Sequence, residues 1–179
     1  MIKKIKDLVN SFKKAEIIEN ARAKTYKQYY NKVSFSAGKD VLDFLYKAEL
    51  NHLKFLEIQE KRLLKGKKVD DSEIKDKPFK PQRRFLFKGL NNLDSDVIIL
   101  ESAAKLEKSD VAFYKEQMQK AKDANAKNFF DKMANLEYSH LNLLKKTINN
   151  ARNEGFSLGS LDPRVLFTKV LKGKSKKGL

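Results

Sequence analysis

Apolar residues recur at steps of three and four along four long stretches of the chain, which is the spacing of one face of an α-helix. The first stretch spans about residues 12–33 and the second about residues 41–64. The third begins near residue 94 and runs to about 121, and the fourth spans about residues 126–152. Four long helices, each with one apolar face, predict an all-α four-helix bundle.

Residues that favour helix ends lie between these stretches. Gly38 suits the end of the first helix and Asp40 the N-cap of the second. Gly66 suits the end of the second helix, and residues 94–96 suit the start of the third because two of them are aspartates. Gly155 is predicted to end the fourth helix.

The segment between the second and third helices is too long for a simple turn. Residues 67–93 contain Pro78, Pro81 and a basic run at 77–84, and they break the helical pattern. In a bundle, a connection of this length crosses from one end to the other. We therefore predict two helix pairs joined by a crossover, with Phe85 and Phe87 capping the bundle. The bundle domain spans residues 1–155, and residues 156–179 form a short extension with a short helix and a basic tail.

Six polar residues fall on the apolar faces that must form the core, and they repeat. Each residue of the first set has a partner of the same type 88 positions later in the second set. Within each set, a glutamate is followed three residues later by a histidine, so both side chains project from one face of a helix. The six residues are Glu19, Glu49, His52, Glu107, Glu137 and His140.

Four carboxylates in an apolar core need compensating positive charge. An unpaired buried carboxylate costs several kcal/mol, and the chain offers no matching set of Lys or Arg on these faces. Two divalent ions would balance four glutamates, with neutral imidazoles completing the ligand set. Oxygen-rich sites with one imidazole per ion and no sulfur suit iron or manganese, and also accept zinc. If Glu49 and Glu137 bridge while Glu19 and Glu107 each bind one ion, open coordination positions remain for chemistry on a small molecule.

Two tyrosines follow the first glutamate of each set. Tyr26 and Tyr114 lie two helical turns beyond Glu19 and Glu107 on the same face. Either phenol could donate a hydrogen bond to a ligand carboxylate, or both could be ordinary core aromatics.

Composition and charge narrow the alternatives. The chain has no cysteine, which excludes disulfides and thiolate-bound metals, and neither a secretory signal nor a membrane span is predicted, so we expect a cytoplasmic protein. A net charge of +16 is compatible with binding to nucleic acid, but the lysines are spread widely. Nucleic-acid binding therefore stays an alternative to the metal centre.

Four segments carry a resemblance to a known family. They are ENARAKTY at 19–26, AELNH at 48–52, LEKSDVAFY at 106–114 and LEYSH at 136–140, and together they resemble the rubrerythrin branch of the ferritin-like di-iron proteins. The resemblance implies a ferritin-like four-helix bundle with two iron ions, often dimeric or larger, that reduces hydrogen peroxide or oxygen or oxidises ferrous iron.

Two features depart from that family. Full-length rubrerythrins carry a cysteine-ligated rubredoxin domain, so here the resemblance implies a separate electron donor such as a rubredoxin. Rubrerythrins also bring an extra glutamate from the third helix, and the shorter Asp110 stands in the corresponding region as an additional candidate ligand. We expect a di-iron peroxidase. The alternatives are a ferroxidase that handles iron and a basic ferritin-like protein that coats nucleic acid.

Overall fold

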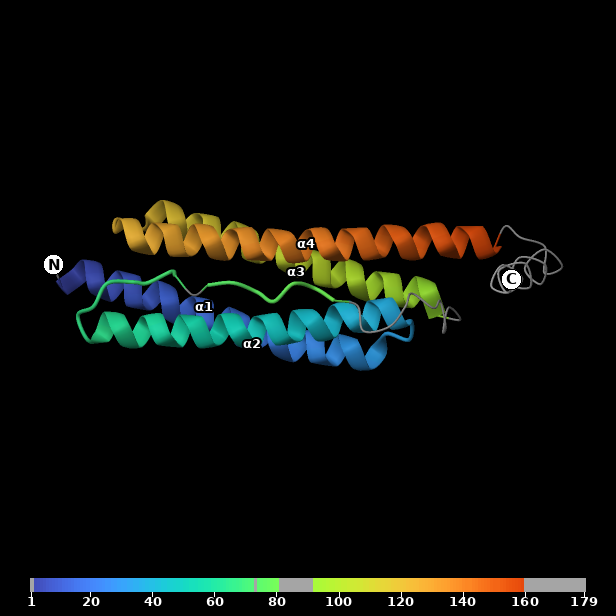
Figure 1. Ribbon diagram of the computed structural model, residues 1–179, viewed down its shortest axis with the longest axis horizontal. Helices are drawn as coiled ribbons and strands as arrows, with labels where there is room; N and C mark the ends of the chain where they lie inside the picture. The colour runs from blue at the N-terminus through green and yellow to red at the C-terminus, as the bar shows by residue number, and fades with distance from the viewer. Residues whose placement is uncertain (1, 73, 81–91, 160–179) are drawn as a thin grey trace, which may run out of the picture.

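Four long helices make up nearly all of the described chain. The computed structural model describes residues 2–72, 74–80 and 92–159. The helices are α1 (Ile2–Lys32), α2 (Ser36–Leu64), α3 (Leu93–Lys120) and α4 (Ala124–Gly159), and the described residues contain no strand. Helix α1 packs against α2 and α3 against α4, and the two hairpins lie side by side (Figure 1). The predicted all-α bundle of two helix pairs is confirmed.

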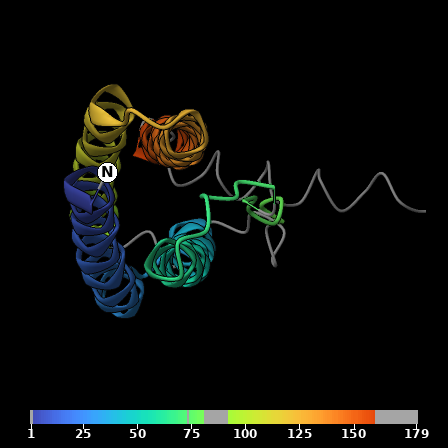
Figure 2. The same cartoon turned by 90° about the vertical axis from the view of Figure 1, so that its left-hand side faces the viewer.

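The start of the crossover runs back along the outside of the bundle. Residues 67–72 and 74–80 lie over α2 and α4, on the side away from α1 and α3 (Figure 2). The Lys132 ammonium on α4 lies 3.0 Å from the Asp71 carboxylate, and the Asn51 amide on α2 donates to the Lys75 carbonyl oxygen at 3.3 Å. The segment is therefore fastened to both hairpins. The predicted cap made by Phe85 and Phe87 lies outside the described residues, as does most of the predicted C-terminal extension.

Helix α2 begins earlier than the sequence pattern predicts. It starts at Ser36, so the assignment of Gly38 to a helix end and Asp40 to an N-cap was wrong. Gly38 lies inside the first turn of α2. A glycine suits this position because there is no room for a side chain. A Cβ there would lie 2.6 Å from Cε1 of Phe35 and 2.8 Å from Cγ1 of Val33.

Gly66 ends α2 as predicted, whereas Gly155 does not end α4. Gly66 adopts a φ of 69°, and its N–H donates to the Leu63 carbonyl at 3.0 Å while the N–H of Lys67 donates to Arg62 at 2.9 Å. These two bonds form a Schellman cap, which needs a residue in the left-handed region. Helix α4 continues through Gly155 to Gly159, since a glycine without that cap only weakens a helix.

The two aspartates predicted at the start of the third helix lie in the first turn of α3, and Asp96 also contacts the other hairpin. Asp96 does not cap its own helix; it is 1% exposed and binds the turn between α1 and α2. Its Oδ2 accepts hydrogen bonds from the backbone N–H of Ser34 at 2.9 Å, the Ser34 hydroxyl at 2.6 Å and the N–H of Phe35 at 3.0 Å. This carboxylate links the two hairpins at one end of the bundle.

Two apolar clusters fill the bundle on either side of a polar layer. One cluster is centred on Leu42, Leu45, Leu100 and Leu144, and the other on Phe12, Phe129, Phe130 and Met133. All eight of these side chains have no exposed surface, and their apolar burial stabilises the bundle. The polar layer between the clusters contains the residues singled out by the sequence.

Candidate metal centre

All four helices contribute to one buried polar cluster. The six predicted ligands are at most 1% exposed, and Glu19 comes from α1, Glu107 from α3, and a Glu–His pair from each of α2 and α4. Their ligand atoms form two groups, each with all atoms within 4.8 Å of one another. Glu49 and Glu137 belong to both groups, which is the arrangement expected of carboxylates that bridge two ions. The groups are Glu19, Glu49, His52 and Glu137, and Glu49, Glu107, Glu137 and His140.

Each Glu–His pair is positioned by its own helix. Three residues is slightly less than one helical turn, so the two side chains leave the same face and meet inside the bundle. Nδ1 of His52 lies 3.4 Å from Oε2 of Glu49, and Nδ1 of His140 lies 3.2 Å from Oε2 of Glu137. In both pairs Nδ1 is the ring nitrogen that faces the carboxylates.

Several oxygens and one nitrogen of this cluster have no hydrogen-bond partner although they are buried. A buried acceptor without a partner costs about 1–3 kcal/mol, so such a group of atoms needs a ligand. Carboxylate oxygens beside an imidazole nitrogen suit a divalent cation of the iron, manganese or zinc type. The residues therefore fit a dinuclear metal site. The atoms without partners are Oε1 and Oε2 of Glu49, Nδ1 of His52, Oε2 of Glu107 and Oε1 of Glu137.

The two tyrosines bind the glutamates of the opposite repeat. The Tyr26 hydroxyl donates to Oε1 of Glu107 at 2.7 Å, and the Tyr114 hydroxyl donates to Oε1 of Glu19. Because each tyrosine holds one oxygen, the other oxygen of each glutamate is left to face the cluster. Sequence spacing placed each tyrosine near the glutamate of its own helix and did not reveal this exchange between the hairpins.

Asp110 is engaged by an arginine on α1. Both of its oxygens accept from the Arg22 guanidinium, with Nε–Oδ2 at 2.5 Å and Nη2–Oδ1 at 2.8 Å. Arg22 and Asp110 are 88 residues apart, so they occupy equivalent positions of the two repeats with opposite charges. Asp110 belongs to none of the three groups of candidate ligands among the described residues. In this arrangement it is part of an ion pair beside the cluster.

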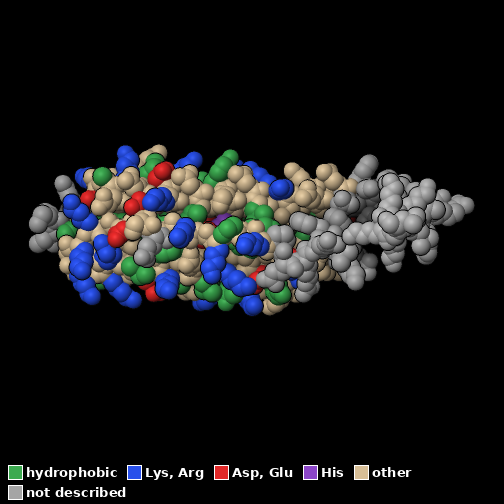
Figure 3. All heavy atoms as spheres, in the orientation of Figure 1, with side chains coloured by type: hydrophobic (Ala, Val, Ile, Leu, Met, Phe, Trp, Pro, Cys, Tyr) green, Lys and Arg blue, Asp and Glu red, His purple; other side chains and the backbone are tan. Residues whose placement is uncertain are grey.

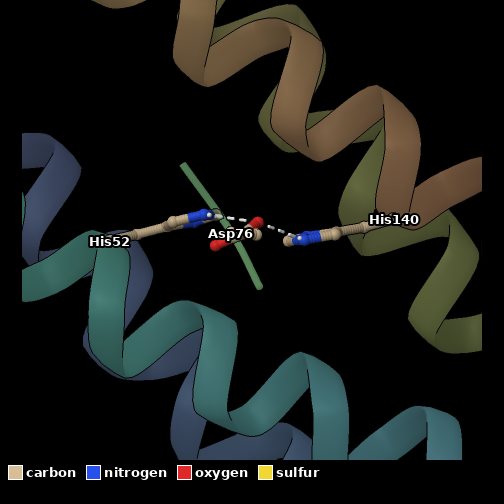
Figure 4. A group of neighbouring side chains, drawn as sticks. All are labelled: His52, Asp76 and His140. Carbon is tan, nitrogen blue, oxygen red and sulfur yellow. Dashed lines mark hydrogen bonds and ion pairs between the residues drawn. The ribbon is translucent and has the colours of Figure 1, made fainter. Parts of the chain in front are cut away.

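Sequence reasoning missed Asp76. This residue lies in the crossover, and one of its oxygens, Oδ2, is 3.1 Å from Nε2 of His52 and 2.8 Å from Nε2 of His140 (Figure 4). The two imidazole rings are stacked, with centroids 5.4 Å apart and planes 11° from parallel. No residue of the four helices lies 88 positions from Asp76, and the segment around it has no helical periodicity. The sequence therefore indicated its role only through its place in a crossover that runs past the site.

Burial and the charges of neighbouring groups favour the protonated forms of Glu49 and Glu107 in the metal-free protein, whereas His52 and His140 hold the pKa of Glu137 below its usual value. Burial, reinforced by the charges of Glu137 and Glu19, raises the pKa of Glu49 well above its usual value. Burial also raises the pKa of Glu107 to about 8, although a hydrogen bond to His140 opposes it. A metal ion that binds these carboxylates must displace protons.

The histidines and Asp76 are shifted in the sense expected of paired charges. Burial would lower the pKa of His52, but the charge of Glu137 and the hydrogen bond to Asp76 raise it well above its usual value. Burial would raise the pKa of Asp76, but hydrogen bonds from His140 and His52 hold it below its usual range. Asp76 is therefore an ionised acceptor at neutral pH.

Comparison with known proteins agrees with this geometry. The sequence model of the rubrerythrin family matches residues 10–148, which include all six candidate ligands. The chain belongs to the rubrerythrin family. A second match to the same family model spans residues 98–162. Searches of the curated proteins and of the solved structures found no match.

The family assignment and the site coincide in this rubrerythrin-family chain. The matched region contains α2, α3 and most of α1 and α4, which are the helices that supply the cluster. No helix among the described residues is both long enough and apolar enough to cross a membrane.

Proposed function

We propose that this protein is an oxidoreductase of the rubrerythrin type, which reduces hydrogen peroxide, or oxygen, at a carboxylate-bridged pair of iron ions. The observation that carries the proposal is the set of buried, unpartnered carboxylate oxygens shared between two ligand groups. Iron is the first choice because the donors are mainly oxygen with one imidazole per ion. Manganese and zinc remain chemically acceptable ions.

The side chains prepare the site in three ways. Glu49 and Glu137 are common to both groups and would be shared by the two ions, while Glu19 and Glu107 would each bind one ion. Tyr26 and Tyr114 fix the outer oxygens of those two glutamates. When bound, two iron ions supply the electrons that split the O–O bond of the substrate.

The overall conversion needs two electrons and two protons for each peroxide reduced to two waters. These 179 residues contain no cysteine and so hold no thiolate-bound iron that could supply electrons, and the proposal includes an electron donor such as a rubredoxin. Four Glu carboxylates and Asp76 outnumber the four positive charges of two divalent ions, once Asp110 is neutralised by Arg22. An excess of negative charge favours loss of electrons from the site. A homodimer or larger assembly remains a prediction of the proposal.

The test uses protein loaded anaerobically with Fe(II). We expect hydrogen peroxide to be consumed repeatedly when a reductant is supplied, and Glu49→Ala to abolish this because it removes a shared ligand. Glu57→Ala is the matched control, since Glu57 lies on the same helix and is exposed. Peroxide loss that stops after one stoichiometric turnover, with the reductant still present, would contradict a peroxidase.

The ferroxidase alternative gives a different result in the same preparation. Sustained oxidation of added Fe(II) by oxygen, with large amounts of iron retained per assembly, would favour iron handling over peroxide reduction. On the face shown in Figure 3, Lys and Arg side chains are spread along the bundle among other residue types. The basic residues on this face are not gathered in one place, and lysines are spread widely along the sequence, so nucleic-acid binding is not the function that we propose.

A further inference from the structure

Among the described residues of the polar cluster, Asp76 is the member that comes from the crossover and has no counterpart in the other repeat. Every other member comes from a helix and has a counterpart 88 residues away, but the crossover occurs once. A single residue can meet equivalent atoms of both repeats only if it lies between them. Asp76 does so, and one of its oxygens, Oδ2, lies within hydrogen-bond distance of both Nε2 atoms (Figure 4).

This contact determines where the hydrogens of both histidines lie. A carboxylate oxygen shared by two ring nitrogens cannot donate to both at once, whereas it can accept from both, so the geometry places a hydrogen on each Nε2. That holds whether the rings are neutral or protonated. Metal binding therefore uses Nδ1, the only ring nitrogen left, and in both histidines it is Nδ1 that faces the glutamates. Nδ1 of His52 lies 3.0 Å from Oε1 of Glu137, and Nδ1 of His140 lies 3.6 Å from Oε2 of Glu107.

The crossover holds Asp76 at this place through contacts to both hairpins. On the α2 side, Asn51 binds the Lys75 carbonyl and Phe44 packs edge-on against Phe79, with ring centroids 5.3 Å apart. On the α4 side, Lys132 binds Asp71. The Asp76 side chain is 10% exposed, so water competes little for its oxygen.

A third metal ion held by His52, Asp76 and His140 is the competing interpretation, because these three residues also form a group with ligand atoms within 4.8 Å. The separations of 2.8 and 3.1 Å between Oδ2 and the two Nε2 atoms are hydrogen-bond lengths. An ion there would also require both Nε2 atoms to lose their hydrogens. The contacts therefore favour hydrogen bonding over coordination.

We propose that Asp76 is a positioning residue that holds both metal-binding histidines with hydrogen on Nε2, so that one crossover carboxylate prepares both ion sites together. The effect on metal affinity rests on the proposed function, whereas the placement of the hydrogens does not. A carboxylate behind a metal-binding histidine typically contributes 10–100-fold in metal affinity. Here one carboxylate stands behind two histidines, so both sites should weaken together when it is removed.

The experiment measures zinc affinity and histidine hydrogens in the same variants. Zn²⁺ is the probe because it has no redox chemistry, and its affinity is obtained by competition with a chromophoric chelator. Nitrogen-15 NMR of the histidine rings reports which nitrogen carries hydrogen. The variants are Asp76→Ala and Asp76→Asn, which keeps an acceptor oxygen without the charge. Asp71→Asn is the matched control, because it changes a crossover aspartate that touches no histidine, while the Asp71 backbone carbonyl still accepts from Lys132 at 2.9 Å and keeps the crossover attached to α4.

We expect two zinc ions in the wild-type protein, each bound through Nδ1, and slowly exchanging Nε2 hydrogens on both rings. Asp76→Ala should weaken both zinc sites by roughly 10–100-fold and speed the exchange of both Nε2 hydrogens. Asp76→Asn should fall between, and it replaces Asp76→Ala as the test if the latter fails to fold. Asp71→Asn should match the wild-type protein.

Three results would overturn the inference. They are unchanged zinc affinity and hydrogen exchange in the Asp76 variants, a change at one histidine alone, and a third zinc bound through Nε2 that disappears in Asp76→Ala. A wild-type protein that binds no metal would instead count against the proposed function. In that case the Nε2 hydrogens of the metal-free protein still test the role of Asp76.

Discussion

The ion pair between Arg22 and Asp110 is open to a quantitative test. The side chains are 17% and 4% exposed, so the carboxylate is almost fully removed from water. Replacing Arg22 with Met keeps most of the aliphatic stem and leaves Asp110 without its partner. Removing one member of a buried ion pair typically costs about 3–5 kcal/mol, because an uncompensated charge is left behind.

Protonation sets a ceiling on that cost. An unpaired Asp110 can take up a proton in the folded protein. In the unfolded chain the pKa of an aspartate is about 3.9, so protonating it at pH 7 costs roughly 4 kcal/mol. We therefore expect Arg22→Met to lower the free energy of unfolding by about 3 kcal/mol at pH 7. Burial raises the pKa of Asp110 to about 6, although the hydrogen bonds of Arg22 pull it down. At pH 7 the wild-type pair is therefore ionised.

The pH dependence follows from the same pKa. The pKa of Asp110 is higher in the folded than in the unfolded protein, so ionising this carboxyl group costs more free energy in the fold. The stability that the protonated carboxyl group contributes at low pH is therefore lost as pH rises through about 6. At pH 5 the carboxyl group is protonated with or without Arg22. The destabilisation by Arg22→Met should accordingly be about 1 kcal/mol smaller at pH 5 than at pH 7.

Urea denaturation of the metal-free protein, followed by circular dichroism at both pH values, measures these effects. The set comprises Arg22→Met, Asp110→Asn and the double variant, which should lose less stability than the sum of the single variants by at least about 2 kcal/mol. The exposed Lys120–Glu116 pair serves as control, and Lys120→Met should change stability little. Additive single effects, or an Arg22→Met cost as small as that of the control, would refute the reasoning.

Three further predictions concern the site and its helices. Tyr26→Phe should leave the fold intact and weaken zinc binding up to about tenfold at the half containing Glu107, because that carboxylate loses its only tyrosine donor; chelator competition measures this, and equal affinity would contradict it. Metal affinity should rise with pH up to about 8, because Glu107 must lose its proton before it binds an ion. Calorimetry in buffers of different ionisation enthalpy should detect the released proton. An affinity that does not change with pH would exclude this coupling. Gly38→Ala should destabilise the protein by about 1–3 kcal/mol in thermal or urea unfolding, because its Cβ overlaps Phe35, and wild-type stability would show that the ring moves freely.

The reliability of sequence reasoning differed between helices and connections. Helical periodicity and the repeat offset placed Glu49, His52, Glu137 and His140 on inward faces, and all four are buried in one cluster. The same reasoning misplaced the start of α2 at Asp40, because the space beside Gly38 is filled by Phe35, a contact that no local rule describes.

Residues that act between elements show the same limit. Asp96 looked like a cap for its own helix, but it binds the turn of the other hairpin. Tyr26 and Tyr114 were placed on the correct faces, while their partners proved to be the glutamates of the opposite repeat. A spacing rule gives the direction of a side chain from its own helix, and it does not give the neighbouring helix that the side chain reaches.

The sequence by itself determined the four helices, their pairing into two repeats and the six polar residues that the core must accommodate. These follow from helical periodicity and a constant offset of 88 residues, which can both be read from the sequence without knowledge of packing. Only the tertiary structure decided that Asp110 pairs with Arg22 and that Asp76 joins both histidines. The physical reason is that an extended crossover has no periodic pattern, and the position of its residues is set by contacts that form once both hairpins are packed.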